Sequence, residues 1–152
     1  NGSLPSVEIA KRQGSTPMPH LIVEYSANLA SDLDRAGLMK RLAEAAVATG
    51  AFPLAGVRVR CHCLEEYRIA DGHPDNAFLH LHVRIGHGRD LATRRQAGEA
   101  IFAALCDFLA PLYANRPLAL SMEISEIDPD LNFKQGNLRD HMKTRGAETI
   151  KA

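Results

Sequence analysis

The feature of this sequence that most restricts its fold is a succession of strand, helix and strand patterns that occurs twice. "HLIVEYS" is a short apolar run, "DLDRAGLMKRLAEAAVATG" places Leu38, Leu42, Ala45 and Ala46 at helical spacing, and "VRVRCHCLEE" alternates like a strand. "AFLHLHVRIG", "GRDLATRRQAGEAIFAALCDFLAPLY" and "PLALSMEISEI" repeat this order, and their last strand begins about 60 residues after its counterpart at Val57. The sequence therefore predicts two strand–helix–strand units in tandem.

These two units predict the fold class. A strand–helix–strand unit within one sheet crosses over right-handedly, so both helices should lie on the same face. The class we predict is α/β (α+β), a four-stranded mixed sheet with two helices on one face. Asp32 or Asp34 should cap the first helix, Gly50 should end it, and a short third helix is expected from Asn137. The buried stripe expected on the second helix is Ala97, Ile101, Ala104, Leu105 and Phe108.

The length of 152 residues fits one domain, which we place at residues 18–145. Residues 1–17, "NGSLPSVEIAKRQGSTP", are rich in Gly, Pro and Ser, show no sustained period and lack the apolar region of a signal peptide. We interpret them as a leader or a remnant of expression. Residues 146–152 are predicted to be a polar C-terminal tail.

Charge and composition exclude several classes of partner. Lys plus Arg and Asp plus Glu each number 18, so the chain has no net charge to attract nucleic acid or an anionic lipid surface. No apolar run is expected to reach the roughly 20 residues of a membrane helix. The three cysteines, Cys61, Cys63 and Cys106, are an odd number without the spacing of a disulfide framework. A cytoplasmic protein that binds neither nucleic acid nor membrane is therefore predicted.

The segments "CHC", "HPD" and "HLH" offer the ligand types of a zinc site, which is a rival from another functional class. In an extended strand, however, His62 faces away from Cys61 and Cys63. No second Cys-x-x-Cys or His-x-x-x-His pair completes four ligands, so we predict no metal. "GHG" lacks the third glycine of a dinucleotide fingerprint and the lysine of a P-loop, so nucleotide binding is not expected either.

The pair Met18-Pro19 is typical of the start of a mature protein, because an initiator Met before Pro is normally removed. A free terminal amine titrates near ~8, and burial lowers its pKa further, so a terminal Pro19 nitrogen can act as a base near neutral pH. The ring of proline also holds that nitrogen in place. With Met18 attached, the same nitrogen is an amide without a basic lone pair. The chain as written is therefore predicted to be a blocked form.

Four ordered blocks carry a resemblance to a known family. "PHLIVEYS", "ATGAFPLAGVRVR", "ADGHPDNAFLHLHVRIGHGRDLATRRQAGE" and "LALSMEISEIDPDLNFKQGN" resemble the 5-carboxymethyl-2-hydroxymuconate isomerases of the tautomerase (4-oxalocrotonate tautomerase-like) superfamily, from Pro19 to about Met142. The resemblance implies that Pro19 is the catalytic acid/base and that Arg58 and Arg89 are functional arginines. It implies a homotrimer without cofactors. The reaction implied converts 5-carboxymethyl-2-hydroxymuconate to 5-carboxy-2-oxohept-3-enedioate in homoprotocatechuate catabolism.

The arginines suit the substrate class that the resemblance implies, a small unsaturated polycarboxylic acid. An arginine fork matches a carboxylate with paired hydrogen bonds that lysine cannot reproduce. Arg89 follows "GHG" directly before a predicted helix, and Arg58 could bind the other end of the substrate or stabilise the dienolate charge. Arg60 lies on the same strand face as Arg58 and is a weaker substrate-binding candidate. Tyr67, just beyond that strand, is a candidate for the pocket wall.

Two further expectations concern assembly and the absence of turnover. A sheet covered on one face by helices should leave an apolar face that needs a partner, and the family's answer is a trimer. The alternative to an enzyme is a non-catalytic small-molecule-binding or structural member of the same fold, since folds host many functions. Blocking the Pro19 nitrogen would abolish activity of the enzyme and leave such a binding module unaffected.

Overall fold

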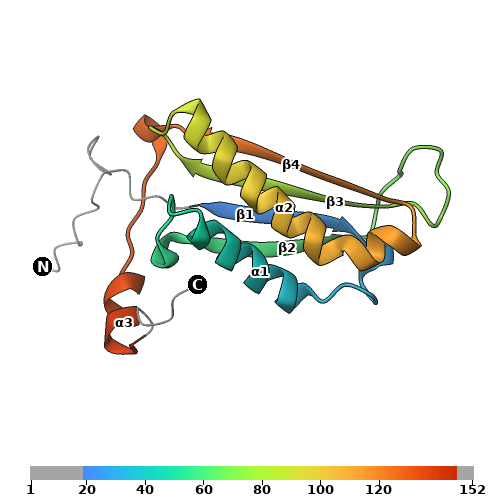
Figure 1. The fold of residues 1–152 in the computed structure, drawn as a ribbon, viewed down its shortest axis with the longest axis horizontal. Coiled ribbons are helices and arrows are strands. Elements are labelled where there is room, and N and C mark those ends of the chain that lie inside the picture. Colours follow the sequence, from blue (N-terminus) through green and yellow to red (C-terminus); the bar gives the residue numbers. More distant parts are fainter. Residues whose placement is uncertain (1–18, 147–152) are drawn as a thin grey trace, which may run out of the picture.

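A computed structural model of the chain describes residues 19–146, so the predicted leader and all but the first residue of the predicted tail lie outside the described residues. Strands and helices alternate along the chain (Figure 1). The elements in order are β1 (His20–Ser26), η1 (Ala27–Leu29), α1 (Arg35–Ala48), η2 (Leu54–Gly56), β2 (Arg58–Leu64), β3 (Ala77–Gly86), α2 (Leu91–Asn115), β4 (Leu118–Ile127), η3 (Pro129–Leu131) and α3 (Leu138–Thr144).

The sheet confirms the two predicted units. Its strand order is β2-β1-β3-β4, with β1 parallel to β2 and β3 parallel to β4. The central strands β1 and β3 run antiparallel, so the second unit is turned end for end relative to the first. Both α1 and α2 cover the same face of the sheet (Figure 1), as the predicted fold class requires.

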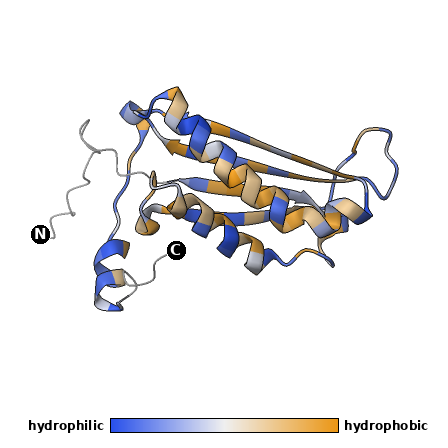
Figure 2. Cartoon of the chain, viewed as in Figure 1, coloured by the Kyte–Doolittle hydropathy of each residue, from blue (hydrophilic) through white to orange (hydrophobic). Residues whose placement is uncertain are grey.

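The core lies between the sheet and these two helices. Alternate residues of β1 point toward the helices, and Leu21, Val23 and Tyr25 are almost fully buried there. Their neighbours on β3 continue the same apolar layer, and α1 adds Leu38 and Leu42. Figure 2 shows both helices lying over the sheet, with apolar (orange) and polar (blue) residues mixed along them. Burial of this alternating set fixes the register, since a one-residue slip would turn it to solvent.

The helix boundaries follow from local chemistry. Asp34 caps α1, where its side chain accepts a hydrogen bond from the Gly37 backbone N–H at 3.0 Å, which decides between the two predicted caps. Gly50 follows the helix with a φ of 77°, the left-handed region that glycine tolerates best. Asp90 caps α2 by accepting from the Thr93 N–H at 2.7 Å. The predicted short third helix is confirmed as α3, with Asn137 at its cap position.

Helix α2 corrects one expectation. By length and composition it qualifies as a membrane span, so the prediction that no apolar run reaches that length was wrong for this segment. Three of its four charged residues, Arg94, Arg95 and Glu99, lie in its first turns, and Asp107 is the only one further along. The predicted stripe of α2 nevertheless packs onto the sheet, with Ala97, Ile101, Ala104 and Leu105 buried and Phe108 partly buried. Such a helix is typical of a protein core.

The face of the sheet away from the helices is polar, so the prediction of an apolar open face was wrong. The strand pairing places Glu24, His80 and Ser121 in one row across this face. The apolar residues of these strands alternate with polar ones, and the helices take the apolar set. The side chains that the pairing places on the open face, most of them polar, are His20, Ile22, Glu24, Ser26, Arg58, Arg60, His62, Leu64, Phe78, His80, His82, Arg84, Ala119, Ser121, Glu123, Ser125 and Ile127.

Candidate active site

One end of the sheet brings Pro19, Arg58 and Arg89 together. Pro19 is buried directly before β1, and its carbonyl oxygen accepts a hydrogen bond of 3.0 Å from the Arg58 backbone N–H at the start of β2. Since β1 and β3 are antiparallel, β3 finishes at this same end, and Arg89 follows it by three residues. The topology therefore gathers three predicted site residues that are far apart in the sequence.

The Arg58 side chain is held by the connector between α1 and β2. Its Nη1 donates to the carbonyl oxygens of Ala55 at 2.7 Å and of Val57 at 3.2 Å. A guanidinium has five N–H donors in a planar fork. Both bonds use one nitrogen, so the Nε and Nη2 groups stay available for a ligand, with no hydrogen-bond partner among residues 19–146.

The Arg89 side chain reaches the same connector from the other unit. Its Nη2 donates to the Ala51 carbonyl at 2.9 Å and its Nη1 to the Gly86 carbonyl at 3.3 Å. The guanidinium carbon lies 4.9 Å from the ring centroid of Phe52, a cation–π distance. Burial lowers the pKa of Arg89 and the nearby Glu126 carboxylate opposes that shift, so the group stays charged at neutral pH.

Glu126 at the end of β4 organises the loop that carries Arg89. Its carboxylate lies 3.2 Å from His87 Nδ1 and 3.2 Å from Arg94 Nη1, and it accepts a 3.4 Å hydrogen bond from the Gly88 backbone N–H. Arg94 also donates from Nε to the Arg89 carbonyl at 3.2 Å. Gly88 has a φ of 124°, which side chains rarely allow. The loop is thus tied on both sides of Arg89.

Several arginines at this end lack a carboxylate partner among the described residues, as the exposed Arg35 and Arg68 at the far end also do, whereas Arg94 at this end has one. Arg41, Arg94 and Arg116 form ion pairs with Asp107, Glu126 and Asp32. Within residues 19–146, no carboxylate lies within 4.0 Å of the guanidinium nitrogens of Arg58, Arg60, Arg84 or Arg89. Arg84 is exposed, whereas Arg58, Arg60 and Arg89 are half-buried. A half-buried cation without a carboxylate partner is expected to bind an anion from solution.

Arg60 contacts the residue that follows Pro19. Its Nη1 lies 2.9 Å from Nδ1 of His20, across the β1–β2 pair. Burial, followed by the charges of Arg60, Arg84 and Arg58, lowers the pKa of His20. Arg60 therefore lies at the predicted end of the sheet, bound to a neighbour of Pro19.

Tyr67 does not reach this end of the sheet within one chain. Strand β2 starts beside Pro19 and finishes at Leu64, so Tyr67 follows its far end, in the loop on the right of Figure 1. Seven residues of strand span about 20 Å. Within one subunit Tyr67 therefore lies away from Pro19, and its predicted role in the pocket wall stays a prediction that requires a neighbouring subunit.

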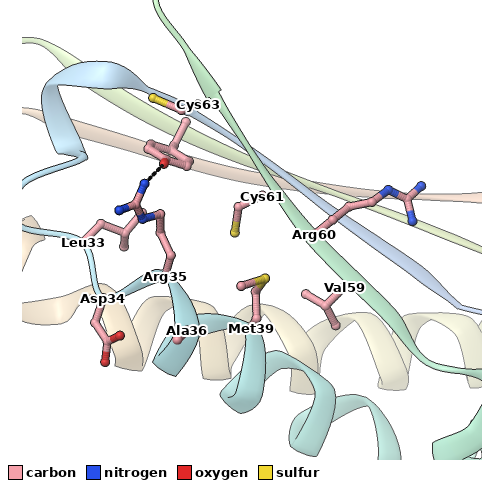
Figure 3. A pocket seen from close by; sticks show the side chains of 10 residues that line it. Leu33, Asp34, Arg35, Ala36, Met39, Val59, Arg60, Cys61 and Cys63 are labelled. Carbon is pink, nitrogen blue, oxygen red and sulfur yellow. Dashed lines mark hydrogen bonds between the residues drawn. The ribbon is translucent and has the colours of Figure 1, made fainter.

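A concavity of about 700 Å³ opens elsewhere, between α1 and the β2 edge. Tyr25, Arg35, Met39, Cys61 and Cys63 line it, and Arg35 Nη1 donates to the Tyr25 hydroxyl at 3.2 Å (Figure 3). Burial raises the pKa of the Cys61 thiol, which makes it less reactive. Neither Pro19, Arg58 nor Arg89 lines this concavity, and the Arg60 guanidinium points away from it in Figure 3. The Pro19 end remains the candidate site on chemical grounds.

The histidines and cysteines of "CHC" divide between the two faces of β2 as predicted. Cys61 and Cys63 pair with Val23 and Tyr25 on the helix side, whereas His62 pairs with Glu24 on the open side. Among residues 19–146, no group of three or more His, Cys, Asp or Glu side chains is arranged to hold a metal ion. All three cysteines are free thiols.

The fold defines the class of protein. It is tautomerase-like, a four-stranded mixed sheet with its helices on one face. A solved structure described as a fused 4-OT wild-type symmetric trimer matches with a TM-score of 0.51 and 20% identity over 70% of this chain and 85% of its own. At that identity the likeness shows the fold alone.

Nearer relatives define the family. The family model described as 5-carboxymethyl-2-hydroxymuconate isomerase matches residues 19–142. A 5-carboxymethyl-2-hydroxymuconate Delta-isomerase of Escherichia coli is 46% identical over 121 residues, which cover 80% of this chain and 96% of that relative. The crystal structure of a 5-carboxymethyl-2-hydroxymuconate isomerase from Deinococcus radiodurans R1 matches with a TM-score of 0.78 and 37% identity, over 84% of this chain and 96% of its own. The chain belongs to the 5-carboxymethyl-2-hydroxymuconate isomerase family.

Three groups at this end escaped prediction from the sequence. Glu126 could have been found from the sequence, since it alternates in phase with the apolar residues of "LALSMEISEI". A charged residue was therefore expected on the face of β4 that is turned toward the helices. His20 had a weaker signal as the residue after Pro19. The carbonyl groups of the connector that hold both arginines had none, because a backbone acceptor leaves no mark in the sequence.

Proposed function

We propose that this chain isomerises 5-carboxymethyl-2-hydroxymuconate to 5-carboxy-2-oxohept-3-enedioate, with the free nitrogen of Pro19 as acid and base, in homoprotocatechuate catabolism. The family membership supports the isomerase class and this substrate. The observation that carries the site is the set of arginines without carboxylate partners at the Pro19 end of the sheet. A substrate with three carboxylates supplies the anionic partners that these guanidinium groups lack.

The proton balance needs no cofactor. The Pro19 nitrogen takes the proton of the 2-hydroxyl oxygen, whose electrons form the 2-oxo group while the two double bonds become one between C3 and C4. The same nitrogen then returns the proton to C5, so no atom or electron is gained or lost. Pro19 is buried, which favours the neutral, basic form of an amine over the cation.

Arg58 and Arg89 take the substrate's carboxylates and the charge of the dienolate. Both guanidinium groups are fixed on one connector, at Ala51, Ala55 and Val57, and retain N–H donors. A fixed cation in a site from which water is excluded stabilises developing negative charge without reorganising. The Phe52 ring beneath Arg89 supplies part of that exclusion. Arg89 is assigned to orient a carboxylate, and Arg58 to bind a second one or the dienolate oxygen.

We further propose a cytoplasmic homotrimer. The free thiols support a reducing compartment. The open sheet face, although polar, is left uncovered by the helices, and a related fold is described as a symmetric trimer. Polar rows are buried between copies where their groups can pair, and Glu24 and His80 lie opposite each other across β1 and β3. A monomer by light scattering would contradict the trimer.

The test of the proposed activity is a rate measurement on protein that begins at Pro19. Two substrates are compared by the change in their ultraviolet absorbance, 5-carboxymethyl-2-hydroxymuconate and 2-hydroxymuconate, which lacks the third carboxylate. We expect turnover of the first with the higher kcat/KM. No isomerisation of either acid, together with their unchanged binding, would support the non-catalytic alternative instead.

A further inference from the structure

We propose that His20 is a further substrate-binding residue, which donates its Nε2–H to a carboxylate, and that Arg60 is the residue that positions it. This inference rests on the proposed function, since it adds one group to the recognition of the same polycarboxylate. Its basis is the contact of 2.9 Å between Arg60 Nη1 and His20 Nδ1.

The contact decides the tautomer of His20. A guanidinium carries only N–H donors and no acceptor. Nδ1 of His20 must therefore be the acceptor, which places the single proton of the neutral ring on Nε2. Protonation of Nδ1 would set an N–H against the N–H of Arg60, so this hydrogen bond and an imidazolium exclude each other. Arg60 thus makes His20 a neutral donor with a defined direction.

The surroundings of His20 favour an anionic partner. His20 is partly buried next to Pro19, and the strand pairing sets it between Arg58 on β2 and Arg84 on β3. His82 is the next residue of β3 on the same face, and its Nε2 is already 2.7 Å from Ser125 Oγ. No carboxylate of residues 19–146 lies within 4.0 Å of His20. The Nε2–H of His20 therefore lies at the end of the sheet where Arg58 and Arg84 provide positive charge.

The protonation behaviour agrees with this geometry. Burial and the three arginine charges lower the pKa of His20 below its ordinary 6.5. The ring is consequently neutral at physiological pH, and the Nε2–H tautomer that Arg60 selects is the populated form. A neutral donor adds a directed hydrogen bond to a carboxylate, whereas the surrounding arginines contribute charge.

The tautomer is tested first, on the full chain, because this measurement does not depend on catalysis. Long-range ¹H–¹⁵N spectra of histidine-labelled protein report which ring nitrogen carries the proton, and His20→Gln identifies the His20 signals. We expect protonated Nε2 in the parent and a mixture of tautomers in Arg60→Met. Arg84→Met is the matched control, since it removes a charge without a hydrogen bond: the pKa should rise and the tautomer should stay. An Nδ1–H form in the parent, or unchanged signals in Arg60→Met, would overturn the positioning role.

The binding role is tested on protein that begins at Pro19. His20→Leu should raise KM for 5-carboxymethyl-2-hydroxymuconate about 10- to 100-fold with a smaller change in kcat. His20→Gln places an amide N–H near the position of Nε2 and should restore most of that loss. Arg41→Met, whose side chain pairs with Asp107 between the helices, should match the parent. A parental KM in a folded His20→Leu variant would refute the binding role.

Failure of the proposed reaction can be told apart from failure of this inference. If the protein does not turn over the substrate, the dissociation constant of propane-1,2,3-tricarboxylate is measured instead. A 10- to 100-fold weaker affinity in His20→Leu, restored in His20→Gln, would support carboxylate binding by His20 without isomerase activity. Equal affinities in all three proteins would overturn it.

Discussion

The two ends of the sheet share one architecture and differ in their side chains. Each end receives the start of two parallel strands from one unit and the finish of two from the other. At the far end, Asn28 Nδ2 donates to the carbonyls of Pro74 at 3.2 Å and Asn76 at 2.7 Å, and Arg116 donates to the Asn28 carbonyl at 3.0 Å while it pairs with Asp32. Most of the polar groups there satisfy one another, although the buried Nε of Arg116 has no hydrogen-bond partner among the described residues.

The Pro19 end also has a closed cluster, in which Glu126 contacts His87 and Arg94. Arg58 and Arg89, however, are fixed on backbone carbonyls, are half-buried and lack a carboxylate partner among residues 19–146. We therefore propose that an anion binds at the Pro19 end. The repeated fold offers two equivalent places for a site, and we expect the half-buried arginines without carboxylate partners to decide which one is used.

The largest effect should follow from removing an arginine at the Pro19 end. Arg89→Met or Arg58→Met in protein that begins at Pro19 should lower kcat/KM about 100- to 1000-fold. Methionine removes the positive charge and the N–H donors that bind the negative charge of the substrate. Steady-state kinetics on the tricarboxylate measures the loss. Arg116→Met is the matched control at the far end, where kcat/KM should stay within about 3-fold while stability falls. Equal losses at both ends would break the comparison.

The next effect concerns the far end. Asn28→Ala leaves the carbonyls of Pro74 and Asn76 without their side-chain donor, and we expect it to lower the free energy of unfolding by about 1–2 kcal/mol. Urea unfolding followed by circular dichroism measures this. Activity of the folded variant should equal that of the parent. A loss of activity with unchanged stability would show that the far end takes part in the reaction, contrary to our proposal.

A smaller effect is expected from the tie between β4 and the Arg89 loop. Glu126→Gln keeps the size of the side chain and removes the charge that attracts His87 and Arg94. Because Arg89 is positioned through this loop, kcat/KM should fall about 10-fold, mainly through KM. Lys40 and Glu44 form an exposed ion pair on α1, so Glu44→Gln is a suitable control that should change neither kcat/KM nor KM. A loss in kcat alone would contradict a positioning role.

The smallest effect is the pH dependence that His20 adds to stability. Its pKa is lowered in the fold, first by burial and then by the arginine charges. The unfolded chain therefore binds the proton first, so this contribution is complete above the unfolded pKa of 6.5 and is lost as pH falls below it. His20→Gln should lose less thermal stability than the parent between pH 7 and pH 5, as scanning calorimetry would measure. A steeper loss in the variant would contradict the sign.

Much of the fold followed from periodicity, because alternation and the helical stripe each bury one face. Leu38 and Leu42 were predicted to share a buried helix face, and the fixed handedness of the crossover placed both helices on one side. The open face was mispredicted as apolar, although the sequence has the polar residues Glu24, His80 and His82 between the apolar residues of these strands. The error came from a general expectation about uncovered sheets rather than from the alternation itself.

The site was predicted less completely than the fold. Four sequence blocks carried the family resemblance, which implied Arg58 and Arg89, and the topology then explains why both lie at one end of the sheet. Tyr67 could not be placed, since the end at which a loop lies depends on strand direction in three dimensions. The pairing of Arg60 with His20 was hidden because cross-strand register is a tertiary property.

The central claim is that the free nitrogen of Pro19 is the acid/base of the reaction. The most direct measurement compares kcat/KM for 5-carboxymethyl-2-hydroxymuconate between protein that begins at Pro19 and protein that retains Met18, with both termini verified by mass spectrometry. An amide nitrogen cannot accept the proton, so we predict that retaining Met18 lowers kcat/KM by at least about 1000-fold. Equal rates from the two proteins would contradict the account.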